Sequence, residues 1–213
     1  AGRADRVEAT GHADLVSLDD GSWWGVFLAT RPFAGQSTLL GRETWLLPVS
    51  WHDGWPLFLT PGEPVPLVVT RPALPVSPGE QWDKWTDDFS EAALSPEWLR
   101  LRGPAPDHAL AGGDLVLVPG KDPAGSLGTP AFLGRRLRHP AASVSTTVSF
   151  APDKPGDFAG LLAFMDEAHF LAFGIEGERL VVRRRTDAKQ DERGEVFAST
   201  PRAGNGPLEL RVA

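Results

Sequence analysis

Two adjoining stretches decide the fold, GHADLVSLDDGSWWGVFLATRP at residues 11–32 and LGRETWLLPVSWHDGWPLF at residues 40–58. In the first stretch, ADLVSL and WWGVFLA flank the polar sequence DDGS, which supplies the residues of a tight turn and predicts a β-hairpin. In the second, ETWLLPVSW alternates, and an HDG turn leads on to WPLFL. Together the two stretches predict about four strands, enough for one sheet.

A lone sheet with such apolar strands cannot cover both of its own faces. Propeller blades are four-stranded sheets that pack between neighbouring blades, so the pattern favours one blade of a larger propeller. The sequence LELRVA at residues 208–213 also reads as a strand, with no closing turn after it. We therefore expect the chain to be a piece of a longer protein, interrupted at both ends.

A proline-rich segment separates this blade from the rest of the chain. Residues 60–80, TPGEPVPLVVTRPALPVSPGE, contain six prolines and two glycines, which predicts an extended linker rather than a helix or a central strand. Beyond residue 80, SPEW predicts a single helical turn with Ser95 as its cap and Pro96 at its first position. Short strands then recur between turn residues, which is typical of a β-sandwich or barrel. They are DLVLVPG, AFLGRRL, ASVSTTVSF, AGLLAFMD, HFLAFGIE, RLVVRRR and LELRVA.

The overall charge excludes several classes of partner. The net charge is −7 and the pI about 5.2, which gives no electrostatic basis for binding nucleic acid or an anionic membrane. The one basic cluster, RLVVRRR at 179–185, runs into the acidic TDAKQDERGE and is interpreted as a solvated strand edge. No apolar run approaches the roughly 20 residues of a membrane span. Cysteine is absent, which excludes disulfides, thiolate metal sites and cysteine nucleophiles but leaves the cellular compartment open.

The motifs GHADLV, WWGVFLATRP and LGRETWLLPVSWHDGWPLF resemble the last blade of glycoside hydrolase family 43, most closely its β-xylosidases and α-L-arabinofuranosidases. WTDDFSEAALSPEWLRLRGP, FLGRRLRH and AGLLAFMDEAHFLAFGI resemble the concanavalin A-like β-sandwich at the carboxyl end of these enzymes. The resemblance implies an all-β fold. Residues 1–80 would be the C-terminal part of a five-bladed catalytic β-propeller with its proline-rich linker, and residues 81–213 an incomplete C-terminal β-sandwich.

Membership of this family implies hydrolysis of xylose- or arabinose-containing oligosaccharides with inversion at the anomeric carbon. One carboxylate activates water and a carboxylic acid protonates the leaving oxygen. In the family a further aspartate adjusts the pKa of that acid, and all three residues lie on blades upstream of the motifs found here. We therefore expect no catalytic residue in this chain and no activity from it alone, because the missing blades must come from the rest of the parent protein.

His12 matches the family's axial histidine, which points into the central channel beneath the sugar pocket and helps to organise the catalytic carboxylates. In some members this histidine binds a calcium ion through water, so calcium is the one ion implied here; the chemistry itself requires no cofactor. The alternative is an inert histidine satisfied within the core. Asp14, two residues on, would share the strand face of His12 and either orient the imidazole or make a backbone contact.

Arg42 matches the family's arginine that reaches the sugar in the innermost subsite. A guanidinium has five donors in a fixed fork and stays charged, so it can hold a sugar hydroxyl and a carboxylate together. The alternative is a surface salt bridge with Glu43 or Asp20. Glu43 itself is excluded from the catalytic set, because neighbours on a strand point to opposite faces.

Seven of the eight tryptophans lie in the first 85 residues. A flat indole suits either a packed core or a carbohydrate-facing surface, and the tryptophans at 23, 24, 45, 51 and 55 are assigned to packing between blades and against the sandwich. Trp82 and Trp85 would fasten the second region to the propeller. Three functions stay in competition: part of a glycosidase, a non-catalytic carbohydrate-binding β-sandwich, and an oligomerisation or docking domain.

Overall fold

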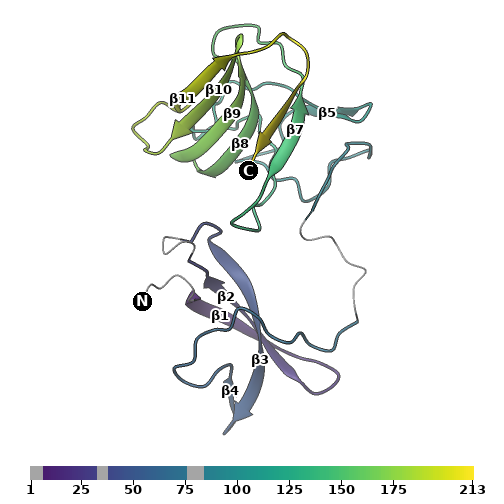
Figure 1. The fold of residues 1–213 in the computed structure, drawn as a ribbon. Helices are drawn as coiled ribbons and strands as arrows, with labels where there is room; N and C mark the ends of the chain where they lie inside the picture. The colour runs from purple at the N-terminus through teal and green to yellow at the C-terminus, as the bar shows by residue number, and fades with distance from the viewer. Residues whose placement is uncertain (1–6, 33–37, 76–83) are drawn as a thin grey trace. The chain divides into compact units, whose positions relative to one another are not determined.

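The computed structural model describes residues 7–32, 38–75 and 84–213, and these residues form strands, turns and loops without a helix. The chain divides into two compact units, Ala1–Asp83 with Leu137–Pro140, and Lys84–Arg136 with Ala141–Ala213. Because the described part contains no helix, it also holds none that is long and apolar enough to span a bilayer. The strands are β1 (Glu8–Ser17), β2 (Trp23–Thr30), β3 (Arg42–His52), β4 (Trp55–Leu57), β5 (His108–Ala111), β6 (Asp114–Leu117), β7 (Val144–Val148), β8 (Phe158–Asp166), β9 (His169–Glu176), β10 (Arg179–Arg185), β11 (Glu195–Pro201) and β12 (Leu208–Val212) (Figure 1).

The first unit is one antiparallel sheet in the order β1-β2-β3-β4, as the sequence predicts. Both predicted turns form. In the β1–β2 turn the Asp20 carboxylate accepts a hydrogen bond from the Ser22 amide at 2.9 Å, and Gly21 has a φ of 83°. In the two-residue β3–β4 turn Asp53 and Gly54 have φ angles of 49° and 79°, which match the strand twist as type I′ turns do.

One face of this sheet is covered by the chain that follows it, and the other is more exposed, although Trp24 is buried there. Phe27, Ala29 and Leu47 form the buried centre of the covered face. The chain that follows β4 closes over them with Phe58, Leu59, Val65 and Val69, so the beginning of the proline-rich segment packs on its own sheet. Exposed apolar side chains lie on the opposite face; they are Val16, Val26 and Leu46. The sheet therefore cannot cover both faces, as its sequence predicts.

The second unit is built on the antiparallel sheet β11-β10-β9-β8, accompanied by the pairs β12-β7 and β5-β6 (Figure 1). Its buried apolar residues lie on β9, β10 and β12; they are Phe170, Ala172, Ile175, Val181 and Leu210. Short strands joined by glycine-containing turns over residues 156–213 confirm the expectation of an all-β second region.

Several details of the second region differ from the sequence predictions. SPEW forms a single turn in which the Ser95 hydroxyl accepts from the Glu97 amide at 3.3 Å, as the predicted cap requires, and the amide of Trp98 donates to the Ser95 carbonyl at 3.0 Å. No helix follows, because the chain then pairs as a bridge at Leu99. AFLGRRL is not a strand. The amide of Phe132 donates to the Pro130 carbonyl at 2.8 Å, which bends the backbone, and only Gly134 pairs, with Leu99. Strands β5 and β11 were not predicted, because neither carries a strong apolar alternation.

The basic sequence at 179–185 is not a solvated strand edge. It forms β10, which lies between β9 and β11 in the sheet. Arg183 makes a bidentate ion pair with Glu176, with nitrogen–oxygen distances of 2.8 and 2.7 Å, and these hydrogen bonds raise the pKa of the Arg183 guanidinium. The guanidinium of Arg184 lies 4.5 Å from the centre of the Phe197 ring. The interpretation failed because a basic run looks solvated in sequence even when each cation has its own partner in the fold.

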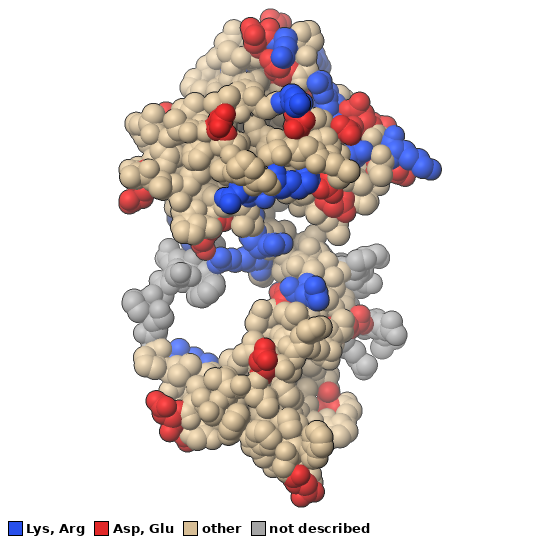
Figure 2. Space-filling model, turned by 180° about the vertical axis from the view of Figure 1, so that it is seen from behind, with Lys and Arg blue, Asp and Glu red and all other residues tan. Residues whose placement is uncertain are grey.

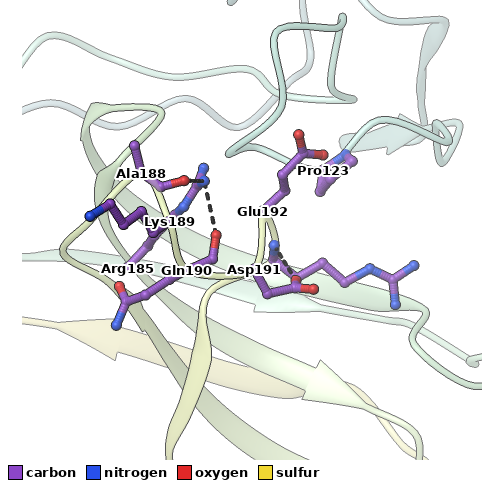
Figure 3. A pocket seen from close by; sticks show the side chains of 8 residues that line it. Pro123, Arg185, Ala188, Lys189, Gln190, Asp191 and Glu192 are labelled. Atoms are coloured by element: carbon purple, nitrogen blue, oxygen red, sulfur yellow. Dashed lines mark hydrogen bonds between the residues drawn. The ribbon is translucent and has the colours of Figure 1, made fainter.

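Arg185, at the end of β10, is only 5 % exposed and has no carboxylate partner among the residues that the structure describes. Its terminal nitrogens donate instead to four main-chain carbonyls, those of Gly125, Glu167, Ala188 and Gln190, at 2.6 to 3.0 Å. Figure 3 shows the guanidinium enclosed by the β10–β11 connection, with the bonds to residues 188 and 190 dashed. One buried cation thus ties three separate loops together.

Replacing Arg185 by methionine is expected to lower the free energy of unfolding of the second unit by about 3 kcal/mol, because four main-chain carbonyls in buried or partly buried positions lose their donors. Arg184→Met is the matched control on the adjacent residue; it removes an exposed cation–π contact worth about 1 kcal/mol or less. Amide hydrogen exchange of β9 and β10 measures the loss of stability in each variant. Equal loss of protection in the two variants would contradict the account.

Candidate functional site

Arg42 is the first residue of β3 and lies opposite Thr30 of β2. Its side chain is exposed, whereas the next residue, Glu43, is half-buried, in keeping with the alternation of strand faces. Arg42 makes no hydrogen bond or ion pair with any other residue in the ranges 7–32, 38–75 and 84–213. The alternative of a salt bridge with Glu43 or Asp20 is not realised, and the guanidinium has all its donors available.

Glu43 is engaged by a residue that the sequence did not single out. Arg31, just after β2, donates two hydrogen bonds to the Glu43 carboxylate, from Nε at 3.2 Å and from Nη2 at 2.8 Å. The two side chains are 38 % and 23 % exposed. Both lie on the covered face of the sheet, because Glu43 is opposite Ala29 and Arg31 follows Ala29 by two residues. A paired, half-buried carboxylate on this face supports the exclusion of Glu43 from the catalytic set.

His12 lies in an interruption of the β1–β2 ladder. Gly11 is opposite Leu28 and Asp14 is opposite Val26, so His12 and Ala13 together occupy the space of one partner residue. This is a β-bulge, a feature that re-aims a side chain and is frequent beside active sites. His12 has a φ of 53°, in the left-handed region that few non-glycine residues adopt. The side chain is exposed.

The bulge corrects the expected relation between His12 and Asp14. Simple alternation would place the two side chains on one face, but an extra residue between Gly11 and Asp14 interrupts that alternation. No hydrogen bond joins the imidazole to the Asp14 carboxylate within the described structure. A role for Asp14 in orienting the imidazole therefore has no support in the geometry.

Calcium is the one ion implied by the sequence, and the residues around His12 do not by themselves form a site for it. Among the described residues no group of three or more histidine, aspartate or glutamate side chains is arranged to hold a metal ion. Calcium takes six to eight oxygen ligands. His12 could contribute only through a bound water, so a calcium site would need oxygen ligands beyond such a group of side chains.

A polar groove lies beside the β10–β11 connection in the second unit. Its lining residues are Pro123, Arg185, Ala188, Lys189, Gln190, Asp191, Glu192 and Arg193 (Figure 3). Several of its polar side chains form hydrogen bonds within the loop itself. The Gln190 amide oxygen accepts from the main-chain amides of Thr186 and Asp187, and the Asp191 carboxylate accepts from the main-chain amide of Arg193. Basic and acidic side chains are also interspersed over the face of the molecule in Figure 2, without a continuous basic surface there.

The tryptophans of the first unit differ in burial. Trp24 is buried, and Trp45 packs at the edge of the first unit's core. Trp51 contacts the Trp23 ring edge-on at 5.2 Å, and Trp55 is 77 % exposed on the β3–β4 hairpin. Packing of Trp55 against another blade therefore stays a prediction.

Of the two tryptophans expected to fasten the second region, Trp82 lies outside the described residues. Trp85 packs within its own unit. Its ring lies edge-on to that of Trp98 with the centroids 5.3 Å apart, and the Arg135 guanidinium lies 3.8 Å from the Trp85 ring centre.

Comparison with known families decides the assignment. A model described as the beta xylosidase C-terminal concanavalin A-like domain matches residues 86–213, and the glycosyl hydrolases family 43 model matches residues 2–56. The chain belongs to glycoside hydrolase family 43. The predicted fold class is confirmed: the first unit corresponds to the end of the family's five-bladed β-propeller and the second to its concanavalin A-like β-sandwich.

Individual relatives agree with this assignment. A non-reducing end α-L-arabinofuranosidase of Bacteroides ovatus is 36 % identical over 84 % of this chain and 35 % of its own length. A xylosidase/arabinosidase of Butyrivibrio fibrisolvens is 32 % identical over 89 % of the chain and 36 % of its own length. A crystal structure of a family 43 protein from Bacillus licheniformis matches with a TM-score of 0.86 and 28 % identity, over 98 % of this chain and 41 % of that protein. The chain thus spans roughly a third of the curated relatives.

The bulge makes a prediction about position 12 that does not depend on catalysis. His12→Val should lower the free energy of unfolding by about 1–2 kcal/mol more than His12→Asn, because a β-branched residue is strained at positive φ whereas asparagine tolerates it. Urea unfolding of the two variants gives the comparison. If they were equally stable, position 12 would not have the left-handed conformation.

Proposed function

We propose that this chain is the carboxyl-terminal part of an inverting glycosidase that releases xylose or arabinose from oligosaccharides. The observation that carries the proposal is Arg42, a guanidinium with no partner among the described residues at the start of β3 in a family 43 blade. An exposed arginine held on a rigid strand, with all its donors unused, is suited to hydrogen bonding a sugar hydroxyl and an adjacent carboxylate.

The reaction divides between residues of this chain and residues outside it. One carboxylate activates the attacking water, and a carboxylic acid on the other side of the sugar protonates the leaving oxygen. Neither residue is assigned here, and both would lie on upstream blades. Arg42 would hold the sugar of the innermost subsite in place. His12, which lies in the β-bulge of β1, would face the channel beneath that sugar. Positioning of this kind contributes to rate by keeping the reacting groups in a productive geometry.

The substrate class rests on the relatives. Those matched here are named as an α-L-arabinofuranosidase and a xylosidase/arabinosidase, and both names describe removal of a pentose. The walls that would distinguish xylose from arabinose lie largely on the upstream blades. The proposal therefore covers both sugars.

The isolated 213-residue chain is expected to hydrolyse neither nitrophenyl xyloside nor nitrophenyl arabinofuranoside, because the proposed acid and base would lie on the upstream blades. The full-length protein, assayed in parallel, should turn over at least one of them. Turnover by the isolated chain would overturn the assignment of the catalytic carboxylates to upstream blades. An inactive full-length protein that binds xylo- or arabino-oligosaccharides would favour the carbohydrate-binding alternative.

Replacing Arg42 by alanine in the full-length protein should lower kcat/KM by one to several orders of magnitude, because a preorganised polar contact is lost. Arg71→Ala is a suitable control, since Arg71 is exposed and, within the described part of the chain, donates to the main-chain carbonyl of Leu74 alone. Circular dichroism and the unfolding temperature should change little in either variant. Wild-type kinetics for Arg42→Ala would remove Arg42 from the substrate site.

A further inference from the structure

The Arg31–Glu43 ion pair lies directly beside Arg42 and closes the end of the β2–β3 hairpin. The last registered pair of these strands is Thr30 with Arg42, and the pair before it is Ala29 with Glu43. Arg31 reaches across to Glu43 with two hydrogen bonds, at 3.2 and 2.8 Å. We propose that this ion pair is a positioning device that fixes the strand register and so aims the Arg42 guanidinium at the substrate; the inference rests on the proposed function of Arg42.

Strand register decides where the Arg42 side chain points. Because side chains alternate between faces, a slip of one residue between β2 and β3 would move Arg42 to the covered face and Glu43 to the open one. The β2–β3 connection is long, from residue 31 to residue 41, so no short turn of fixed type sets the register at this end. A bidentate side-chain pair across the two strands supplies that constraint.

The surroundings of the pair favour a rigid geometry. Ala29 is fully buried and Phe27 is 5 % exposed on the same face, so the ion pair borders the core of the first unit rather than open solvent. On the other side of β2, the Thr30 hydroxyl donates to the Glu8 carbonyl of β1 at 3.2 Å. The three strands are therefore tied together at the point where Arg42 emerges.

The chemistry of the pair calls for arginine and glutamate in particular. A guanidinium presents two parallel donors to the two carboxylate oxygens, which fixes both distance and direction, whereas a lysine ammonium makes a single-point contact. The second unit contains a pair of the same geometry, Arg183–Glu176, with side chains 17 % and 20 % exposed. It has no proposed connection with the substrate and is a matched control.

The test compares kcat and KM of the full-length protein carrying Glu43→Gln, Arg31→Lys, Arg42→Ala, Glu43→Gln with Arg42→Ala, and Glu176→Gln. Displacing a substrate-positioning group by about 1 Å can cost about 100-fold. We expect Glu43→Gln and Arg31→Lys each to lower kcat/KM by about 10- to 100-fold, and Glu176→Gln to stay within about two-fold. The double variant should be no slower than Arg42→Ala alone, because residues that act through one another are non-additive.

Each outcome has a defined meaning. If Arg42→Ala is damaging while Glu43→Gln and Arg31→Lys are silent, the positioning role is wrong and the proposed function stands. If Arg42→Ala is itself silent, the proposed substrate arginine is wrong. If the Glu43 and Arg42 losses multiply, or if Glu176→Gln costs as much activity, the pair acts on stability alone and the inference is overturned. Arg31→Lys keeps the charge and tests the inference even if Glu43→Gln does not fold.

Discussion

The register of the β2–β3 ladder is the constraint on which the first unit depends. It places Phe27, Ala29 and Leu47 under the chain that follows β4, and it leaves Val26 and Leu46 exposed on the opposite face. The same register sends Glu43 to the covered face, where Arg31 holds it, and Arg42 to the open face. Core formation and display of the candidate substrate arginine are therefore consequences of one pairing.

Much of this could be read from the residues, because the signals are local. Alternation in ETWLLPVSW and turn residues in DDGS and HDG predict the sheet, and opposite facing of neighbours separates Arg42 from Glu43. The His12 bulge could not be predicted, since it depends on a mismatch between two strands that single-strand periodicity does not report. Arg31 was overlooked for a related reason: it meets Glu43 only once the register across a long connection is known.

The second unit shows how a cation's partners decide its environment. In sequence, Arg183, Arg184 and Arg185 are a basic run, yet they contact a carboxylate, an aromatic ring and a set of main-chain carbonyls respectively. Burial of Arg185 is tolerated because its two terminal nitrogens donate to four carbonyls, although its Nε has no partner among the described residues. The sequence gives the charge of such a run, but the partners of each arginine are known only from the fold. Arg135, in the sequence AFLGRRL, likewise has its own partners, the Glu97 carboxylate and the Trp85 ring.

The central claim is that Arg42 emerges from the blade to contact the sugar. A crystal structure of the full-length protein with bound xylose or arabinose tests it most directly. A guanidinium nitrogen of Arg42 should lie within about 3.2 Å of a sugar hydroxyl, with the Arg31–Glu43 pair intact behind it. A sugar bound in the propeller channel with Arg42 turned away from it, or paired elsewhere in the protein, would contradict the account.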